Sequence, residues 1–480
     1  MTRRFLHVPE QYPGKTIVAV GLLFLMAYSV AAALVPRRGG RLVVGDAVHY
    51  YVYLRSAVFD RDLQFRNEYV RLYGLRGGEE DTEWVYQPTA TGHVRNLMSI
   101  GPAIVWAPLF VLATAGVAAA RALGSTYAMD GYGVLFQASA GLGGILAATL
   151  GAWLAWRLCR RFFDARIAIW ATLAVWLGSS AVYYSVISPI YSHASSMLVS
   201  SLFFYAWGTS LGRQTPARYG LVGVLAGLTM LVRWQDAVFL VVPFSDAVLH
   251  AFAGAPSPGE AARGGSPSGL QPESSETGRR PGWRQLVINL AACGAGALLA
   301  FSPQMLVWMV LFGRPFVVPQ GGEFMQWGAP HLFSVLFSDW RGLFTWTPVL
   351  ALSAVGLVPL WRRQRSLAIG MIAALILSWY ANAAVIDWWA GEAYGARRFV
   401  SCFPIFVVGL AALADRFRAS LSRLVTLAVV FVSLNFLLLL QYQLFMHGWR
   451  ALAPYPRGFY GLVVARFVVP FRLIAWLWGD

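Results

Sequence analysis

Long apolar runs constrain this chain more than any other feature of its sequence. Runs of about 18 residues or more with few charges recur along the 480 residues, and each is long enough to cross a hydrocarbon core about 30 Å thick as a helix. Lipid offers no partner to backbone amides, so such runs are predicted to be helices. The alternating strands of about ten residues that a membrane β-barrel needs are absent. The predicted fold class is an all-α, polytopic transmembrane protein.

We expect about eleven membrane-spanning helices from these runs. The apolar segments are 16–35, 101–122, 131–157, 167–187, 192–211, 217–232, 236–252, 285–312, 348–361, 366–385, 399–414 and 421–442. A further amphipathic stretch, 459–478, is long enough either to span or to lie flat. With 58% hydrophobic and only 12% charged residues, the chain lacks the polar surface of a soluble domain, which has roughly 25% charged residues.

The net charge of +16 comes from arginines in short loops between the apolar runs, so membrane lipids and not nucleic acid are the expected partners. Four loops, near residues 157–166, 213–218, 362–365 and 416–423, carry these arginines. Basic loops face the cytoplasm, which predicts a multi-pass protein of the inner (plasma) membrane with its N-terminus in the cytoplasm. This topology requires that 101–122 dips into the outer leaflet or lies along it. The alternative places the N-terminus outside and lets 101–122 span.

The chain is expected to have two transmembrane modules. The N-terminal module is 1–252, with a long first extracytoplasmic loop at 36–100 that contains juxtamembrane helices, and the C-terminal module is 284–480. Between them, 253–283 consists largely of Pro, Gly, Ser, Ala and Glu. Such a composition cannot bury a core, so the segment is predicted to be a disordered cytoplasmic linker.

The first outer loop is the densest polar region, and it begins with Asp46 soon after the first apolar run. The following residues, through Tyr53 and Arg55, suggest an amphipathic helix at the membrane interface. Asp46 is then either a helix N-cap or a general base held above the outer leaflet. His49 lies one turn further along the same predicted face, and it is either a partner of Asp46 or an interfacial aromatic.

A first apolar helix followed by Gly45-Asp46-x-x-His49-Tyr50 and a long outer loop resembles the GT-C superfamily of membrane glycosyltransferases. The order of the later pieces, the basic run 157–166 and a helix beginning near Ser188-Pro189 and His193, is similar to its protein O-mannosyltransferase and aminoarabinose-transferase branch. The resemblance covers roughly 16–250. It implies transfer of a sugar from a polyprenyl-phosphate donor to a glycan, lipid or protein acceptor outside the cytoplasm, with inversion, and it maps the loop aspartate of the family onto Asp46.

Arginines on the predicted outer side are candidates for holding the donor phosphate, because a guanidinium can bind phosphate through two parallel hydrogen bonds. Arg233 lies in a polar break between two apolar runs. It is either a phosphate ligand or the partner of Asp236 in a structural ion pair. The segment 387–398 combines acids, arginines and aromatics, which suits sugar and phosphate binding or an interfacial aromatic belt. The predicted substrate-binding residues are His49, Arg55, His193, Arg233, Arg341, Glu392, Arg397 and Arg398.

The sequence departs from the family at two places that bear on a metal. Ala47 follows Asp46 where many members have a second acid, and His193 stands where many have another carboxylate. No metal ligand is therefore assigned and no cofactor is certain, although a divalent metal stays an alternative. Three other functions also remain open: an envelope oligosaccharide polymerase or ligase, a lipid or sugar transporter, and a non-catalytic GT-C scaffold.

Overall fold

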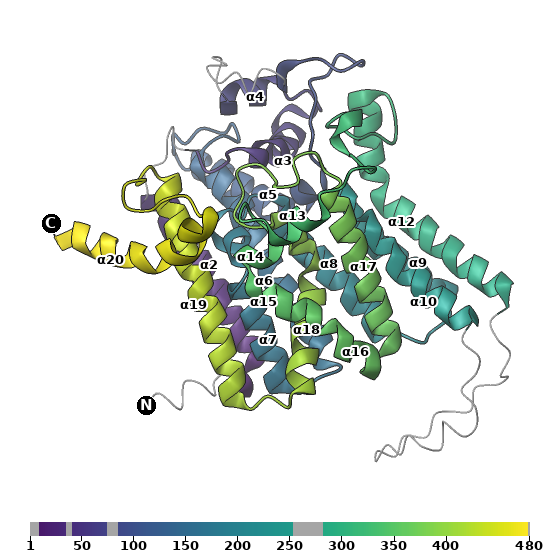
Figure 1. The fold of residues 1–480 in the computed structure, drawn as a ribbon. Helices are drawn as coiled ribbons and strands as arrows, with labels where there is room; N and C mark the ends of the chain where they lie inside the picture. The colour runs from purple at the N-terminus through teal and green to yellow at the C-terminus, as the bar shows by residue number, and fades with distance from the viewer. Residues whose placement is uncertain (1–8, 35–40, 74–84, 253–281, 479–480) are drawn as a thin grey trace, which may run out of the picture.

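A computed structural model describes residues 9–34, 41–73, 85–252 and 282–478. Of the residues in these ranges 75% are helical and none forms a strand, which confirms the predicted all-α class (Figure 1). The helices of the first half are α2 Pro13–Leu34, α3 Asp46–Arg55, α4 Arg66–Tyr73, α5 Gly101–Ala122, α6 Val134–Arg160, α7 Ala165–Leu177, α8 Ser192–Thr209, α9 Pro216–Val232 and α10 Val241–Phe252. Those of the second half are α12 Trp283–Phe312, α13 Leu332–Phe337, α14 Leu343–Trp346, α15 Pro348–Val355, α16 Leu357–Arg363, α17 Arg365–Ala383, α18 Phe403–Arg416, α19 Leu421–Met446 and α20 Ala465–Trp478.

The two ends of the helix bundle differ. Figure 1 shows the short helices α3, α4 and α13 at one end, drawn at the top, which we call the loop end. At the other end, here called the linker end, α10 finishes and α12 begins. The predicted linker, 253–283, lies outside the described residues except at its last two positions, and its last residue, Trp283, starts α12.

Eight stretches of the described chain are long and apolar enough to cross a membrane. They coincide with α2, α5, α6, α12, α17, α19, the stretch Arg397–Arg416 that contains α18, and the stretch Tyr460–Trp478 that contains α20. The shorter apolar helices α7 and α9 lie in the same bundle. The segments expected to span at 236–252 and 348–361 are each divided into two shorter helices. The figure of about eleven spans therefore stays a prediction.

Helix α5 meets the criteria of a span, but its contacts keep it at the loop end. Its first residue, Gly101, packs against the backbone of Leu231 at the end of α9. Its last turns line an apolar cavity together with Val134, the first residue of α6. Since α6, α7, α8 and α9 alternate in direction, the start of α6 and the end of α9 lie at the same end of the bundle. Both ends of α5 therefore contact the loop end, and the expectation that 101–122 stays in or along one leaflet remains a prediction.

The two halves of the chain meet along α9 and α12, whose backbones come very close. A Cβ added to Gly223 of α9 would lie 2.0 Å from the carbonyl oxygen of Cys293 in α12, and one added to Gly296 would lie 2.4 Å from that of Gly220. Small residues let membrane helices approach until their backbones touch, and this packing replaces the hydrophobic effect that lipid does not provide. Glycine at these positions therefore determines how the C-terminal half docks on the N-terminal half.

Candidate active site

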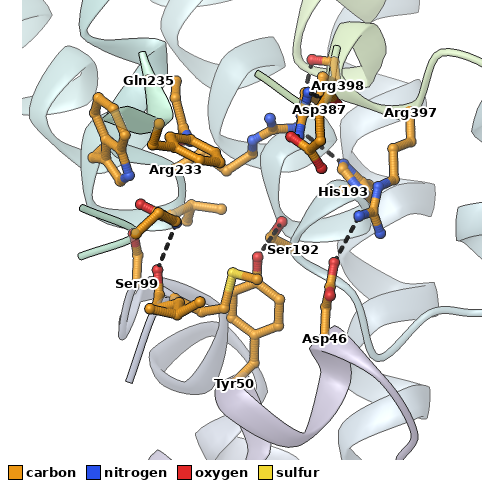
Figure 2. A pocket seen from close by; sticks show the side chains of 16 residues that line it. Asp46, Tyr50, Ser99, Ser192, His193, Arg233, Gln235, Asp387, Arg397 and Arg398 are labelled. Atoms are coloured by element: carbon orange, nitrogen blue, oxygen red, sulfur yellow. Dashed lines mark hydrogen bonds and ion pairs between the residues drawn. The ribbon is translucent and has the colours of Figure 1, made fainter. Parts of the chain in front are cut away.

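A polar cavity of about 210 Å³ lies at the loop end and draws residues from both halves of the chain. Figure 2 shows its side chains converging from opposite walls. Its lining residues are Asp46, Tyr50, Leu97, Met98, Ser99, Ser192, His193, Val232, Arg233, Trp234, Gln235, Gln320, Phe324, Asp387, Arg397 and Arg398. Five of the residues predicted from sequence, namely Asp46, His193, Arg233, Arg397 and Arg398, are therefore brought together here.

Asp46 is the first residue of α3, and its carboxylate faces the cavity. The preceding Gly45 has φ +57°, a left-handed conformation that glycine adopts without strain. The N-cap position belongs to Gly45 and no side chain caps the helix, so the alternative that Asp46 is an N-cap is wrong. Asp46 Oδ2 instead lies 2.7 Å from Nη2 of Arg397, and its side chain is 35% exposed. The carboxylate is therefore ionically paired yet open to a substrate.

The rest of α3 is not the exposed interfacial helix that the sequence suggested. All residues from Ala47 to Arg55 are buried, because α4 and α5 pack against this helix. The tyrosine hydroxyls make internal hydrogen bonds: Tyr51 donates to the carbonyl of Gly131 at 2.6 Å. The reason is that several segments cover α3, and the carbonyls of Met98 and Gly131 and the hydroxyl of Ser192 supply the polar partners that were expected from lipid headgroups or water.

Arg397 and Arg398 are consecutive residues, and each bonds a different carboxylate of the cavity. They begin the short 3-10 helix Arg397–Cys402 that leads into α18. Arg398 donates to Oδ1 of Asp387 at 2.6 Å and to its backbone carbonyl at 2.9 Å. The side chains of Arg397 and Arg398 are only 12% and 13% exposed. Mostly buried guanidinium groups that keep one edge toward a cavity are suited to binding an anion.

Arg233 is the arginine of this cavity that forms no ion pair with any described carboxylate. Its Nη1 lies 3.0 Å from Nδ1 of His193 and 3.4 Å from the carbonyl of Arg398. A guanidinium has donors only, so Nδ1 of His193 accepts this hydrogen bond. Asp236 makes no direct ion pair with Arg233, since its carboxylate accepts from the hydroxyl of Ser401 at 2.8 Å, but it still interacts electrostatically with Arg233 at longer range. Arg233 is 7% exposed, and an unpaired buried cation is an expected anion ligand.

His49 and Arg55, which were predicted to bind substrate, do not line the cavity. His49 is buried against Tyr69, whose hydroxyl lies 3.0 Å from its Nδ1, and burial lowers the pKa of His49 to about 4. Arg55 forms ion pairs with Asp60 and, at 3.0 Å, with Glu68. Burial raises the pKa of Glu68 to about 7, against the opposing effect of Arg55. Both predicted residues thus hold α4 onto α3, and the residue of α3 that reaches the cavity one turn after Asp46 is Tyr50.

Arg341 and Glu392 also lie outside the cavity, but Arg341 holds one of its walls. Its guanidinium donates to the backbone carbonyls of Gly391 and, at 3.5 Å, of Trp389. Both carbonyls belong to the loop that carries Asp387 and the two arginines of the cavity. Arg341 itself has φ +65°, an unusual conformation for a residue with a side chain. Glu392 is exposed to solvent, as expected of a charged loop residue without an ion-pair partner.

Several lining residues were not singled out from the sequence. Asp387 stood inside the polar segment 387–398, and its carboxylate could have been chosen in place of that of Glu392. Tyr50 donates a hydrogen bond to Ser192 at 3.0 Å, and both residues are adjacent to motifs that were noted. Ser99, Gln235 and Gln320 carried no signal, because uncharged polar residues are common in loops and only the fold brings these three to one cavity.

The residues that the structure describes do not form a site for a resident divalent metal. Such ions need several oxygen or nitrogen ligands at one point, and no group of three His, Cys, Asp or Glu side chains with that geometry occurs in the described ranges. The two carboxylates of the cavity are each bonded to an arginine. The three cysteines at 159, 293 and 402 are buried and unpaired. No chemical step is therefore assigned to a metal.

No protein-family model and no curated protein sequence matches this chain. Among solved structures, ArnT from Cupriavidus metallidurans, bound to undecaprenyl phosphate, is 14% identical, with a TM-score of 0.46 over 95% of this chain and 75% of its own. The Archaeoglobus fulgidus oligosaccharyltransferase, in complex with Zn and sulfate, is 12% identical, with a TM-score of 0.44 over 88% of this chain. A structure of the same archaeal enzyme, AglB, with an inhibitory peptide and a dolichol-phosphate is 12% identical, with a TM-score of 0.42.

These neighbours are GT-C glycosyltransferases, the superfamily that the sequence resembles. The chain spans 55% of the length of the two oligosaccharyltransferase structures. At such identities and TM-scores the likenesses carry no functional argument, so the function has to be argued from the side chains of this chain.

Proposed function

We propose that this protein transfers a sugar from a polyprenyl-phosphate donor to a hydroxyl of an envelope acceptor, with inversion at the sugar carbon. The observation that carries the proposal is the meeting of one accessible carboxylate, Asp46, with three mostly buried arginines around one cavity at the end of a helix bundle. A cavity of this kind can accept a proton on one side and hold a lipid-borne phosphate on the other.

The phosphate is held by Arg233, with Arg397 and Arg398 beside it. Arg233 forms no direct ion pair with a described carboxylate, although the Asp236 carboxylate interacts with it at longer range, so an incoming phosphate gains a charge-assisted hydrogen bond without displacing an ion-pair partner. As the bond between the sugar carbon and the phosphate oxygen breaks, negative charge grows on that oxygen. Donors fixed in place before the reaction lower the barrier to such a charge.

Asp46 acts as the general base in this proposal. The acceptor oxygen attacks the sugar carbon, its proton moves to the carboxylate of Asp46, and the polyprenyl phosphate leaves with the electron pair of the broken bond. Inversion requires attack from the side opposite the leaving phosphate. Figure 2 shows Asp46 rising from one wall while Arg233 and Arg398 project from the other, which supports this division of roles.

The site faces the extracytoplasmic side in this proposal. Arginines that mark the cytoplasmic face by the positive-inside rule lie at the linker end, where Arg160 ends α6 and Arg363 ends α16. The cavity lies at the loop end. Its position at one surface also disfavours a transporter, whose substrate site is expected near the middle of the membrane.

The proposal is tested by binding of undecaprenyl phosphate to the purified full-length chain in lipid nanodiscs. Arg233→Met should weaken binding by about 10- to 100-fold, the loss expected for one charge-assisted hydrogen bond of about 1.5–3 kcal/mol. Arg457→Met is the matched control, since Arg457 lies at the same end but is 59% exposed and outside the cavity. Unchanged affinity in Arg233→Met, or an equal loss in the control, would overturn the phosphate site.

A further inference from the structure

The cavity has a charged end and an uncharged end. Asp46, Arg397, Asp387 and Arg398 lie at the charged end, and Figure 2 shows Ser99 and Gln235 on the side away from Asp46. We call Ser99, Gln235 and the uncharged lining residues near them in the sequence, Leu97, Met98, Val232 and Trp234, the uncharged end, together with Gln320, which bonds the carbonyl of Leu97, and Phe324. Arg233, which lies between Val232 and Trp234 in the sequence, is the charged lining residue that borders this end.

The polar groups of the uncharged end suit sugar hydroxyls. A glutamine amide both donates and accepts hydrogen bonds, as a hydroxyl does. Gln320 donates through Nε2 to the carbonyl of Leu97 at 3.1 Å, while its Oε1 is buried without a hydrogen-bond partner in the described chain. Trp234 adds an indole face to the same lining, and aromatic faces pack against the C–H face of a sugar ring.

None of the described residues assigned to this end is an acid that could neutralise an ammonium group on a sugar. Both carboxylates that line the cavity already bond arginines, Asp46 with Arg397 and Asp387 with Arg398. Asp236 does not line the cavity; its carboxylate accepts from Ser401 and interacts electrostatically with Arg233. An ammonium group placed near Gln235 and Gln320 would lose its hydration without gaining an ion pair, which costs binding energy. A sugar with a carboxylate group would also find no ion-pair partner here, because Arg233 binds the phosphate of the donor.

We propose that the uncharged end binds the sugar of the donor and selects an uncharged sugar over an amino sugar or a uronic acid. The inference rests on the proposed function, since it presumes that the charged end holds the lipid phosphate. It assigns Ser99, Trp234, Gln235 and Gln320 as residues that determine specificity.

The test compares four lipids on the full-length chain in nanodiscs: undecaprenyl phosphate, and the same lipid carrying glucose, 4-amino-4-deoxyarabinose or glucuronic acid. The glucose form should bind at least about tenfold more tightly than either charged form, a difference of about 1.4 kcal/mol. If the bare lipid binds but a charged form binds as tightly as the glucose form, only this inference is overturned. If the bare lipid does not bind, the proposed function is overturned and this inference with it.

A pair of variants tests the same residue in two ways. Gln320→Glu places a carboxylate at the uncharged end, so it should raise affinity for the amino-sugar lipid about tenfold and lower affinity for the glucose form. Gln320→Met removes the amide without adding charge, so it should weaken the glucose form and give the amino sugar no gain. Binding of bare undecaprenyl phosphate by both variants shows that they are folded. Equal effects of Gln320→Glu and Gln320→Met on the two glycolipids would contradict the assignment.

Discussion

Replacing Asp46 by asparagine should change catalysis and donor binding in opposite directions. The substitution keeps the shape of the side chain and removes only its negative charge. If Asp46 is the base, the turnover number should fall by about 10²- to 10⁴-fold, which is the usual contribution of a positioned general base.

The effect on donor binding comes from Arg397. Its Nη2 lies 2.7 Å from the carboxylate of Asp46, so the substitution leaves Arg397 without its anionic partner and adds one net positive charge to the cavity wall. The Asp46 side chain is 35% exposed, and solvent therefore screens the charge it removes. We expect a gain of about 1 kcal/mol for a lipid phosphate, or roughly fivefold tighter binding.

The assay measures both quantities on one preparation in nanodiscs: the affinity for undecaprenyl phosphate, and the release of that lipid from its glycosylated form in the presence of envelope acceptor. Asp387→Asn is a useful comparison, because it frees Arg398 in the same way but removes no proposed base. It should tighten lipid binding and leave far more turnover than Asp46→Asn. Normal turnover in Asp46→Asn, or equal losses of turnover in the two variants, would refute the assignment of Asp46.

Three further predictions concern the surroundings of the site. Arg341→Met should weaken undecaprenyl phosphate binding severalfold without unfolding the bundle, because the loop 387–398 loses the contacts that hold it; unchanged binding together with unchanged proteolysis of that loop would contradict this. Glu68 has a pKa of about 7 in the folded protein, above its unfolded value of about 4.5, so its contribution to stability is fully present below pH 4.5 and is lost as pH rises to 7. In the wild-type protein the free energy of unfolding should therefore fall by about 2–3 kcal/mol between pH 5 and 7, and Glu68→Gln should remove this fall. An unaltered pH dependence of stability in Glu68→Gln would contradict the raised pKa of Glu68. A cysteine at Arg314, which is exposed at the loop end, should react with an impermeant thiol reagent on intact cells, whereas one at Gln364 should react only after permeabilisation; the reverse pattern would indicate the inverted topology.

Most helices could be predicted from the sequence, because a helix that lies in lipid is apolar over its length and long apolar runs therefore locate it. Segments such as 101–122 and 421–442 match α5 and α19 closely. The rule failed where short polar interruptions decide the outcome. Residues 236–252 were expected as one span, but Pro243 and the polar residues near Arg233 leave a 3-10 helix, Trp234–Leu240, ahead of α10. Hydropathy alone does not describe such breaks.

The charged part of the candidate site could also be anticipated, because charges at membrane depth are rare and conspicuous. Arg233 stood out for this reason, and Arg397 stood out as part of the polar segment 387–398. Arg55 was also predicted to bind substrate, yet it pairs with Glu68 in the folded outer loop. Nothing in the sequence distinguishes a guanidinium that meets a carboxylate from one that meets a cavity. The uncharged residues, such as Gln320, could not be predicted, because their role depends on the docking of distant segments.

The seam of glycines between α9 and α12 has a consequence for where damaging changes occur. Asp46 and Arg233 precede the linker and Arg397 follows it, so the cavity is complete only when the two halves are seated against each other. Gly223 lies about 14 Å along α9 from Val232 at the cavity. A single methyl group there would collide with a backbone carbonyl and push the halves apart. A substitution at Gly223 should therefore abolish activity although this residue does not contact the substrate.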